Sequence, residues 1–267
     1  MQESIVDLNG RPVFYRSCGE GPALVLLHGF AEDGRVWREQ YDRFPAHRLI
    51  IPDLPGSGRS PAQPDMSMEG LANTIHVLCN ELQAKPCILV GHSMGGYVAL
   101  AFAERYAADI AGLGLFHSTA FADTEEKKAT RRKGIAFMDD NGAYEFLKIS
   151  TPNLYSDDTK KDRPELVEAQ LETVKDMRKE ALAAYYEAMM QRPDRTGVLS
   201  ATTVPVLFIL GRSDTAVPLA DGLKQCHLPA TAVVQVFERS GHMGMQEEKE
   251  KAGDALEAFA KICLSDR

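Results

Sequence analysis

A serine flanked by glycines stands where an apolar run of the chain meets a helical one. Residues 91–96 read Gly-His-Ser-Met-Gly-Gly, with the apolar run 87–90 before them and the helix-favouring run 97–102 after them. A nucleophilic oxygen must stand clear of a sheet, which requires a tight, strained turn whose positions two before and two after the serine are small. The pattern predicts a strand, a sharp turn and a helix, with Ser93 as nucleophile. The alternative is an ordinary glycine-rich turn.

Two later segments supply the partners that a serine nucleophile needs. A serine hydroxyl is weak unless a base takes its proton and a third group orients that base. Residues 204–211 are typical of a buried strand that leads to Asp214, and residues 232–237 of a last strand that leads to His242. Serine, acid and histidine in this order match the turn motif, and both partners follow carboxyl ends of strands. Asp214 as a turn residue and His242 as a helix-capping neighbour are the alternatives.

The other histidines and acids fit these roles less well. His92 lies inside the turn itself, and His117 ends a strand but precedes Asp214 in the order. The remaining candidates follow no strand directly: His47, His76, His227, Asp123 and Asp221. The sequence therefore favours Asp214 and His242.

An earlier strand end offers donors for the negative charge that forms when a carbonyl is attacked. The apolar run 23–27 leads to His28-Gly29-Phe30. Such an oxyanion needs preorganised donors, and in this motif they are the backbone N–H of the residue after the nucleophile and one from this earlier loop. We expect these donors to be Met94 and Phe30. We expect His28 to shape the loop and, with Gly29, to border the bound substrate.

Composition narrows the class of protein and its partners. The chain has 267 residues, 44% of them apolar, and a net charge of −8, which argues against nucleic acid binding. No apolar run approaches the ~20 residues of a membrane span, and the N-terminus has no signal-peptide pattern. Its five cysteines form no C-x-x-C pair, which is typical of a reducing compartment. We expect a cytoplasmic protein with a small-molecule substrate, no metal and no cofactor. The oligomeric state is not readable from the sequence.

Strands alternate with helices along most of the chain. Asn9-Gly10 is a strong hairpin signal between two short strands, which predicts an antiparallel edge. The alternation that follows predicts a mostly parallel sheet with helices on both faces, an α/β fold. The eight expected strands are 5–7, 13–15, 23–27, 49–52, 87–90, 113–116, 204–211 and 232–237.

This alternation stops between residues 119 and 199. The segment has no convincing strand but several amphipathic helices, among them one expected over 164–190. Of its apolar side chains, we expect Phe137, Tyr185 and Met189 to face a substrate pocket. The alternative is that they form a small core of the segment itself.

Together these motifs resemble the α/β-hydrolase superfamily, in its lid-bearing serine esterase-like branch. The matching segments span almost the whole chain: 28–30, 53–60, 91–96, 211–214 and 240–242. The resemblance implies an eight-stranded α/β-hydrolase fold with a helical lid after the sixth strand. It divides the chain into a core, 1–118 and 200–267, and a lid, 119–199. The single glycine of His28-Gly29-Phe30 resembles members that act on ordinary short or medium esters.

The resemblance also implies a reaction. We expect a serine hydrolase that cleaves small to medium, largely apolar carboxylic esters through Ser93, His242, Asp214 and an acyl-enzyme. A C–C bond hydrolase and a haloperoxidase- or perhydrolase-like enzyme are alternatives that use the same residues. A ligand receptor or signalling protein that retains the triad is an alternative of another class.

Overall fold

Eight strands form one sheet in this protein. The structure, a computed structural model, describes residues 1–265, so the last two residues of the expected segment 200–267 lie outside it. The strands are β1 Gln2–Asp7, β2 Pro12–Cys18, β3 Ala23–Leu27, β4 Arg48–Pro52, β5 Cys87–His92, β6 Ile110–Phe116, β7 Val206–Gly211 and β8 Ala232–Phe237. The short 3₁₀ helices are η1 Gly34–Gln40, η2 Ala107–Asp109 and η3 Thr151–Leu154.

Eleven α-helices lie among the described residues. Up to residue 174 they are α1 Met68–Glu81, α2 Met94–Arg105, α3 Glu125–Asn141, α4 Ala143–Ser150, α5 Asp157–Asp162 and α6 Pro164–Val174. After residue 174 they are α7 Lys179–Gln191, α8 Thr196–Ala201, α9 Leu219–Leu223, α10 Gly244–Glu247 and α11 Lys249–Leu264. None of the helices within residues 1–265 has the length and apolarity to cross a bilayer.

The sheet order confirms the predicted mostly parallel arrangement. It runs β1-β2-β4-β3-β5-β6-β7-β8, in which β1–β2 and β2–β4 are antiparallel and the other pairs are parallel. Asn9 and Gly10 take positive φ values of 59° and 81°, as a two-residue type I′ hairpin requires. The Leu8 amide donates to the Arg11 carbonyl across this turn, at 3.0 Å.

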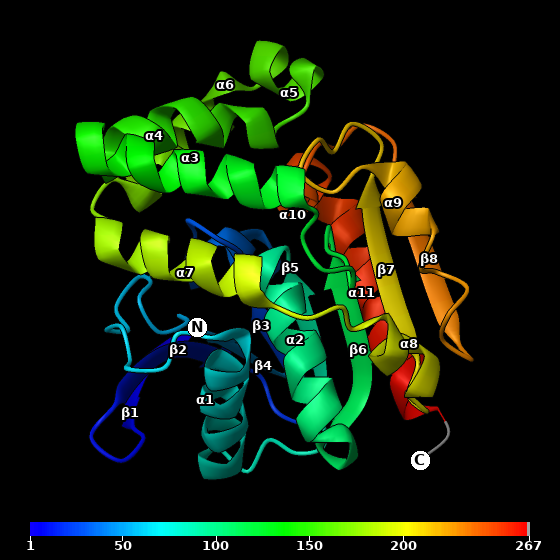
Figure 1. The fold of residues 1–267 in the computed structure, drawn as a ribbon. Helices are drawn as coiled ribbons and strands as arrows, with labels where there is room; N and C mark the ends of the chain where they lie inside the picture. The colour runs from blue at the N-terminus through cyan, green and yellow to red at the C-terminus, as the bar shows by residue number, and fades with distance from the viewer. Residues whose placement is uncertain (266–267) are drawn as a thin grey trace.

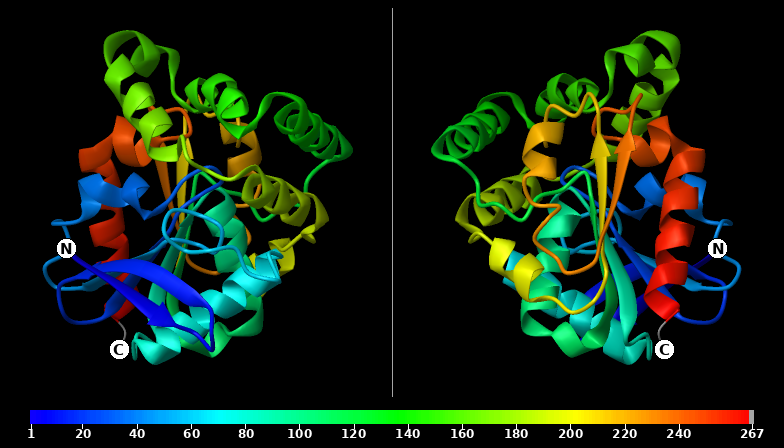
Figure 2. Two further views of the ribbon diagram at one scale, coloured as in Figure 1. Left: turned by 90° about the vertical axis from the view of Figure 1, so that its left-hand side faces the viewer. Right: turned by 90° about the vertical axis from the view of Figure 1, so that its right-hand side faces the viewer.

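Both faces of the sheet are buried, because successive side chains of the strands point to opposite sides. On β3, Val25 and Leu27 pack with α1 and α2, whereas Leu24 and Leu26 pack with Trp37 and α11. Figure 2 shows α11, in red, and the pair α1 and α2, in cyan to green, on opposite sides of the sheet. The apolar core therefore lies in two layers around continuously hydrophobic strands.

A helical segment, α3 to α8, stands between β6 and β7. Figure 1 shows α3 to α7 gathered at one end of the sheet, the end at which β6 leads into α3. The prediction of one helix over 164–190 is wrong, because α6 ends at Val174 and α7 begins at Lys179. This turn lets Val174 and Leu182 both enter a small apolar cluster of the segment. Because both helices pack into this cluster, the chain turns between them although its sequence favours one long helix.

Two adjacent tyrosines of α7 join this segment to the rest of the protein. The Tyr185 hydroxyl donates to the Pro55 carbonyl at 2.5 Å and lies 2.9 Å from Ser57 Oγ. The Tyr186 ring stacks on Phe30, with ring centroids 4.2 Å apart and an interplanar angle of 6°. Helix α7 is therefore held against two core loops at once.

Removing the Tyr185 hydroxyl should destabilise the protein. In Tyr185→Phe, the buried Pro55 carbonyl loses its donor, and we expect the free energy of unfolding to fall by about 1–2 kcal/mol in urea titrations. Tyr144→Phe is the control, because Tyr144 is 38% exposed, and it should change stability by less than about 0.5 kcal/mol. Equal losses in the two variants would show that the Tyr185 hydroxyl does not fasten α7.

Candidate active site

Ser93 lies at a turn in which the backbone has no room for side chains. It joins β5 to α2 with φ 49° and ψ −116°, a strained conformation for a residue with a Cβ. An added Cβ at Gly91 would overlap backbone atoms of Gly95 and Gly96, and one at Gly95 would lie 2.6 Å from the His28 carbonyl oxygen. The close approach of β5 to α2 therefore requires glycine on both sides of Ser93.

Asp214 and His242 meet at the carboxyl ends of β7 and β8. His242 Nδ1 lies 2.8 Å from Asp214 Oδ2, and both side chains are buried. Because an ionised carboxylate only accepts hydrogen bonds, Nδ1 carries the proton and donates it. In the neutral ring Nε2 is then the acceptor, which is the form that a general base needs.

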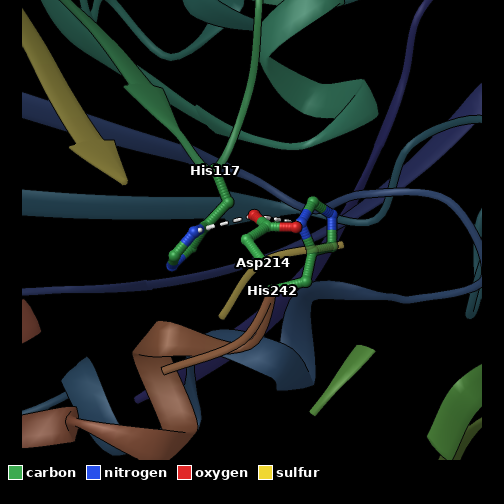
Figure 3. Close-up of side chains that lie close together, drawn as sticks. All are labelled: His117, Asp214 and His242. Atoms are coloured by element: carbon green, nitrogen blue, oxygen red, sulfur yellow. Dashed lines mark hydrogen bonds and ion pairs between the residues drawn. The ribbon is translucent and has the colours of Figure 1, made fainter. Parts of the chain in front are cut away.

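The Asp214 carboxylate has more partners than His242. Its Oδ1 accepts the backbone N–H groups of Ala216 and Val217, each at 2.9 Å. A second histidine, His117, places its Nδ1 3.2 Å from Oδ2, without the alignment of a hydrogen bond. Figure 3 shows His117 and His242 on opposite sides of the carboxylate. No pattern in the sequence connects His117 with Asp214.

Burial and charge set the protonation states of these three groups. Burial opposes ionisation of Asp214, but the two histidines hold its pKa well below the ordinary 3.8. Burial also opposes charging of His242, but the Asp214 carboxylate outweighs it and raises the pKa of His242 above 6.5. For His117 burial dominates and lowers the pKa to about 4. At neutral pH His117 is therefore an uncharged ring beside an ionised Asp214.

The loop after β3 lies against Ser93 and is fixed by hydrogen bonds. A Cβ added to Gly29 would lie 3.1 Å from Ser93 Cβ. His28 Nδ1 donates to the Gly29 carbonyl at 2.9 Å, and His28 Nε2 accepts the Leu54 amide at 2.9 Å. The Gly29 carbonyl belongs to the peptide that carries the Phe30 N–H, so His28 sets the direction of that donor. Met94 begins α2, where the first N–H groups have no partner within the helix.

Two buried glutamates that the sequence analysis missed hold the loops of this site. Glu32 Oε2 accepts the Gly29 amide at 2.6 Å. Glu247 Oε2 accepts the amides of Gly241 and Met243, on either side of His242, at 2.8 and 3.2 Å. No spacing rule identifies them, because an acid that accepts backbone N–H groups within its own loop has no distinct sequence pattern.

The residues expected to face a pocket lie in different surroundings. Tyr185 and Met189 are 0% and 2% exposed and belong to the core layer that α7 joins, whereas Phe137 is partly exposed. From Phe137, aromatic rings run through Phe146 and Tyr186 to Phe30, with centroids 6.4, 6.0 and 4.2 Å apart. An apolar path therefore connects α3 with the loop beside Ser93.

A cavity of about 780 Å³ opens between the turn joining α6 to α7 and the core loops. Its lining includes Arg16, Asp53, Arg59 and Glu180 but not Ser93, Asp214 or His242. This charged hollow differs from the substrate pocket that the sequence predicts, because Phe137, Tyr185 and Met189 are not among its lining residues.

The two histidines and the aspartate of the buried cluster carry nitrogen and oxygen atoms of the kinds that bind metal ions. His117, Asp214 and His242 offer ligand atoms within 4.8 Å of one another. An ion bound through His242 Nδ1 would replace the hydrogen bond between His242 and Asp214. That nitrogen can therefore donate to Asp214 or ligate a metal, but it cannot do both at once.

Known proteins share this architecture. A sequence model described as "Alpha/beta hydrolase family" matches residues 24–259. The chain is 28% identical to the AB hydrolase superfamily protein YisY of Bacillus subtilis, with 93% of this chain and 95% of that protein covered. It is 27% identical to a pimeloyl-[acyl-carrier protein] methyl ester esterase of Methylococcus capsulatus, over 92% and 98% of the two chains.

A solved structure agrees with these matches. It is that of a malate-bound thermophilic esterase from Thermogutta terrifontis, which superposes with a TM-score of 0.91 at 29% identity. The match covers 98% of this chain and 99% of that one.

The buried His117 should make stability depend on pH in a specific window. Its pKa is about 4 in the folded protein and 6.5 ordinarily, so the unfolded chain binds more protons between these values and stability rises with pH. Such a difference corresponds to roughly 3 kcal/mol. We expect urea titrations from pH 4 to 6.5 to show a shallower rise for His117→Gln than for the wild type.

The matched control is His227→Gln, since His227 is exposed. Its stability should follow the wild-type slope across the same window. If His117→Gln also kept the wild-type slope, burial would not suppress protonation of His117.

Proposed function

The chain belongs to the alpha/beta hydrolase family, and from that premise we propose that it is a serine carboxylesterase. One observation carries the proposal: the buried hydrogen bond of 2.8 Å between His242 and Asp214. It fixes the tautomer of a general base whose backbone carbonyl lies 2.9 Å from the ring of His92, the residue before the strained Ser93. The similarity to an esterase of known structure and to a methyl ester esterase favours an ester as substrate.

The mechanism that we propose uses the triad and two backbone donors. Ser93 Oγ attacks the acyl carbon while His242 Nε2 takes its proton, and Asp214 stabilises the imidazolium that forms. The N–H groups of Phe30 and Met94 hold the oxyanion. His242 then gives the proton to the leaving alcohol, which departs and leaves an acyl group on Ser93. Water, deprotonated by His242, releases the carboxylic acid and restores Ser93.

We propose that residues 119–199 form a lid over this site and that residues 1–118 and 200–267 form the catalytic core. The rings of Phe137, Phe146 and Tyr186, which lead to Phe30, support a largely apolar substrate of small to medium size. Tyr185 and Met189 act indirectly in this proposal, because they hold α7 in place.

The nucleophile can be tested by labelling and by activity. A fluorophosphonate should label Ser93, as found by mass spectrometry. Ser93→Ala should lower ester turnover on the order of 10⁴-fold or more, and Ser93→Ala/His242→Ala should lose little beyond the single variant, because the two residues act as a unit.

Three outcomes would contradict the proposal. Label on another serine would remove Ser93 from the mechanism. Turnover of a ring-fission diketone without turnover of simple esters would identify a C–C bond hydrolase. Tight binding of a small molecule with no turnover would favour a receptor.

The lid can be tested with activated esters of increasing acyl length. Phe137→Ser and Tyr186→Ser should change the ranking of these esters by ~10–200-fold, since one apolar contact is worth roughly 1–3 kcal/mol of discrimination. A very small phosphonate barely reaches the lid and should label Ser93 at nearly the wild-type rate.

Ile149→Ser provides the control, because Ile149 is an apolar residue of the same segment but 61% exposed. It should leave the ranking unchanged. A flat chain-length profile in all variants, together with a collapse of small-probe labelling, would make residues 119–199 a stability element.

A further inference from the structure

Glu32 and His92 form a buried acid–histidine pair that the proposed mechanism does not use. Their side chains are 1% and 0% exposed, and His92 Nδ1 lies 2.9 Å from Glu32 Oε2. Glu32 belongs to the loop after β3, whereas His92 ends β5 and directly precedes Ser93. A buried charged pair costs free energy to desolvate, and hydrogen bonds to the surrounding loops must offset that cost.

Both ends of the pair are bonded to elements of the candidate site. Glu32 Oε2 also accepts the Gly29 amide at 2.6 Å, in the loop that carries the Phe30 donor. His92 Nε2 lies 2.9 Å from the backbone carbonyl oxygen of His242. The pair therefore forms a continuous bridge from the oxyanion loop, past the nucleophile, to the backbone of the base.

The hydrogen bonds determine which atoms of this bridge carry protons. A carbonyl oxygen only accepts, so His92 Nε2 carries a proton. Burial opposes ionisation of Glu32, but His92 and the Gly29 amide outweigh it and lower the pKa of Glu32 below 4.5. An ionised Glu32 accepts from His92 Nδ1 as well, so both ring nitrogens of His92 act as donors in this arrangement. The other histidine rings facing it are those of His242 and the neutral His117, with centroids 4.8 and 6.2 Å away.

We propose that Glu32 and His92 are positioning residues, which hold the oxyanion loop, Ser93 and His242 in register through one buried ion pair. The proposal rests on the proposed function, since it assigns the pair to that same site. Neither side chain contacts the substrate or the reacting atoms in this scheme. Their effect is to keep the Phe30 N–H and the His242 ring in fixed places while charge develops on the substrate.

A glutamine at position 32 cannot replace the carboxylate. Glu32 Oε2 accepts two donors, and His92 donates a third hydrogen bond to the His242 carbonyl. Beside an uncharged Gln, His92 loses one ring proton, so either its bond to position 32 or its bond to His242 fails. If the amide turns its NH₂ group toward His92 instead, the Gly29 amide loses its acceptor. At most two of the three bonds survive in a variant of nearly unchanged shape.

The experiment compares Glu32→Gln with Asp33→Asn on an activated short-chain ester. Asp33 is a neighbouring buried carboxylate that is bonded to Arg35 and has no bond to Gly29 or His92. We expect Glu32→Gln to lower kcat on the order of 10²-fold with little change in KM, as loss of geometry at an oxyanion donor does. Asp33→Asn should keep the wild-type kcat.

A trifluoromethyl ketone separates positioning from stability. Its hemiketal with Ser93 would place an oxyanion at the same donors, so its inhibition constant should rise in Glu32→Gln by the same factor as kcat falls. Fluorophosphonate titration of active sites corrects both quantities for any unfolded fraction. A kcat per titrated site equal to that of the wild type, or an unchanged inhibition constant, would overturn the proposal.

The protonation of His92 gives a readout that does not depend on turnover. In ¹H–¹⁵N correlation spectra of the wild type, both ring nitrogens of His92 should carry protons at neutral pH. One unprotonated nitrogen would overturn the ion pair. If the wild type neither hydrolyses esters nor labels at Ser93, the proposed function fails; if it does both while Glu32→Gln behaves like Asp33→Asn, only this inference fails.

Discussion

The backbone contact beneath Ser93 is the constraint on which the site depends. Gly91 and Gly95 approach so closely that neither position can carry a side chain. A side chain at Gly95 would also collide with the carbonyl oxygen of His28. Strand β5, helix α2 and the loop after β3 therefore meet within one backbone-to-backbone contact. Gly29 lies so close to Ser93 that an added Cβ would be 3.1 Å from Ser93 Cβ. A shift of any of the three elements would therefore displace the nucleophile relative to the proposed donors.

Buried carboxylates organise the remaining loops. Asp214, Glu32 and Glu247 each accept at least two N–H donors. Glu32 follows β3, Asp214 follows β7, and Glu247 ends α10 after β8. A buried carboxylate without such donors would be strongly unfavourable, so each acid imposes a definite conformation on the backbone around it. Loops after three different strands thereby become as well defined as the sheet that carries them.

The parts of this structure that local sequence rules govern were predictable. The eight strands, the Asn9-Gly10 hairpin and the two-sided burial follow from apolar runs and from turn residues with restricted backbone geometry. The turn around Ser93 was predictable for the same reason. Its glycines are required because Gly91 and Gly95, only four residues apart in the chain, are in close backbone contact.

The parts that depend on distant contacts were not predictable. The break between α6 and α7 arises because Val174 and Leu182 pack into one cluster. His117 and Asp214 lie in contact although they are 97 residues apart in the sequence, on the loops after β6 and β7. The roles of Glu32 and Tyr185 likewise depend on partners that the chain brings close only on folding.

The helical segment between β6 and β7 is also part of the support for His242. The carbonyl of Leu154 accepts the His242 amide at 2.6 Å, and the amide of Ser156 donates to Glu247 at 2.8 Å. Gly241 lies so close to this segment that an added Cβ would be 2.7 Å from the Leu154 oxygen. The segment therefore cannot be exchanged as an independent module. A chimaera with the corresponding segment of a relative must reproduce this short backbone stretch and keep glycine at position 241, or His242 loses its support.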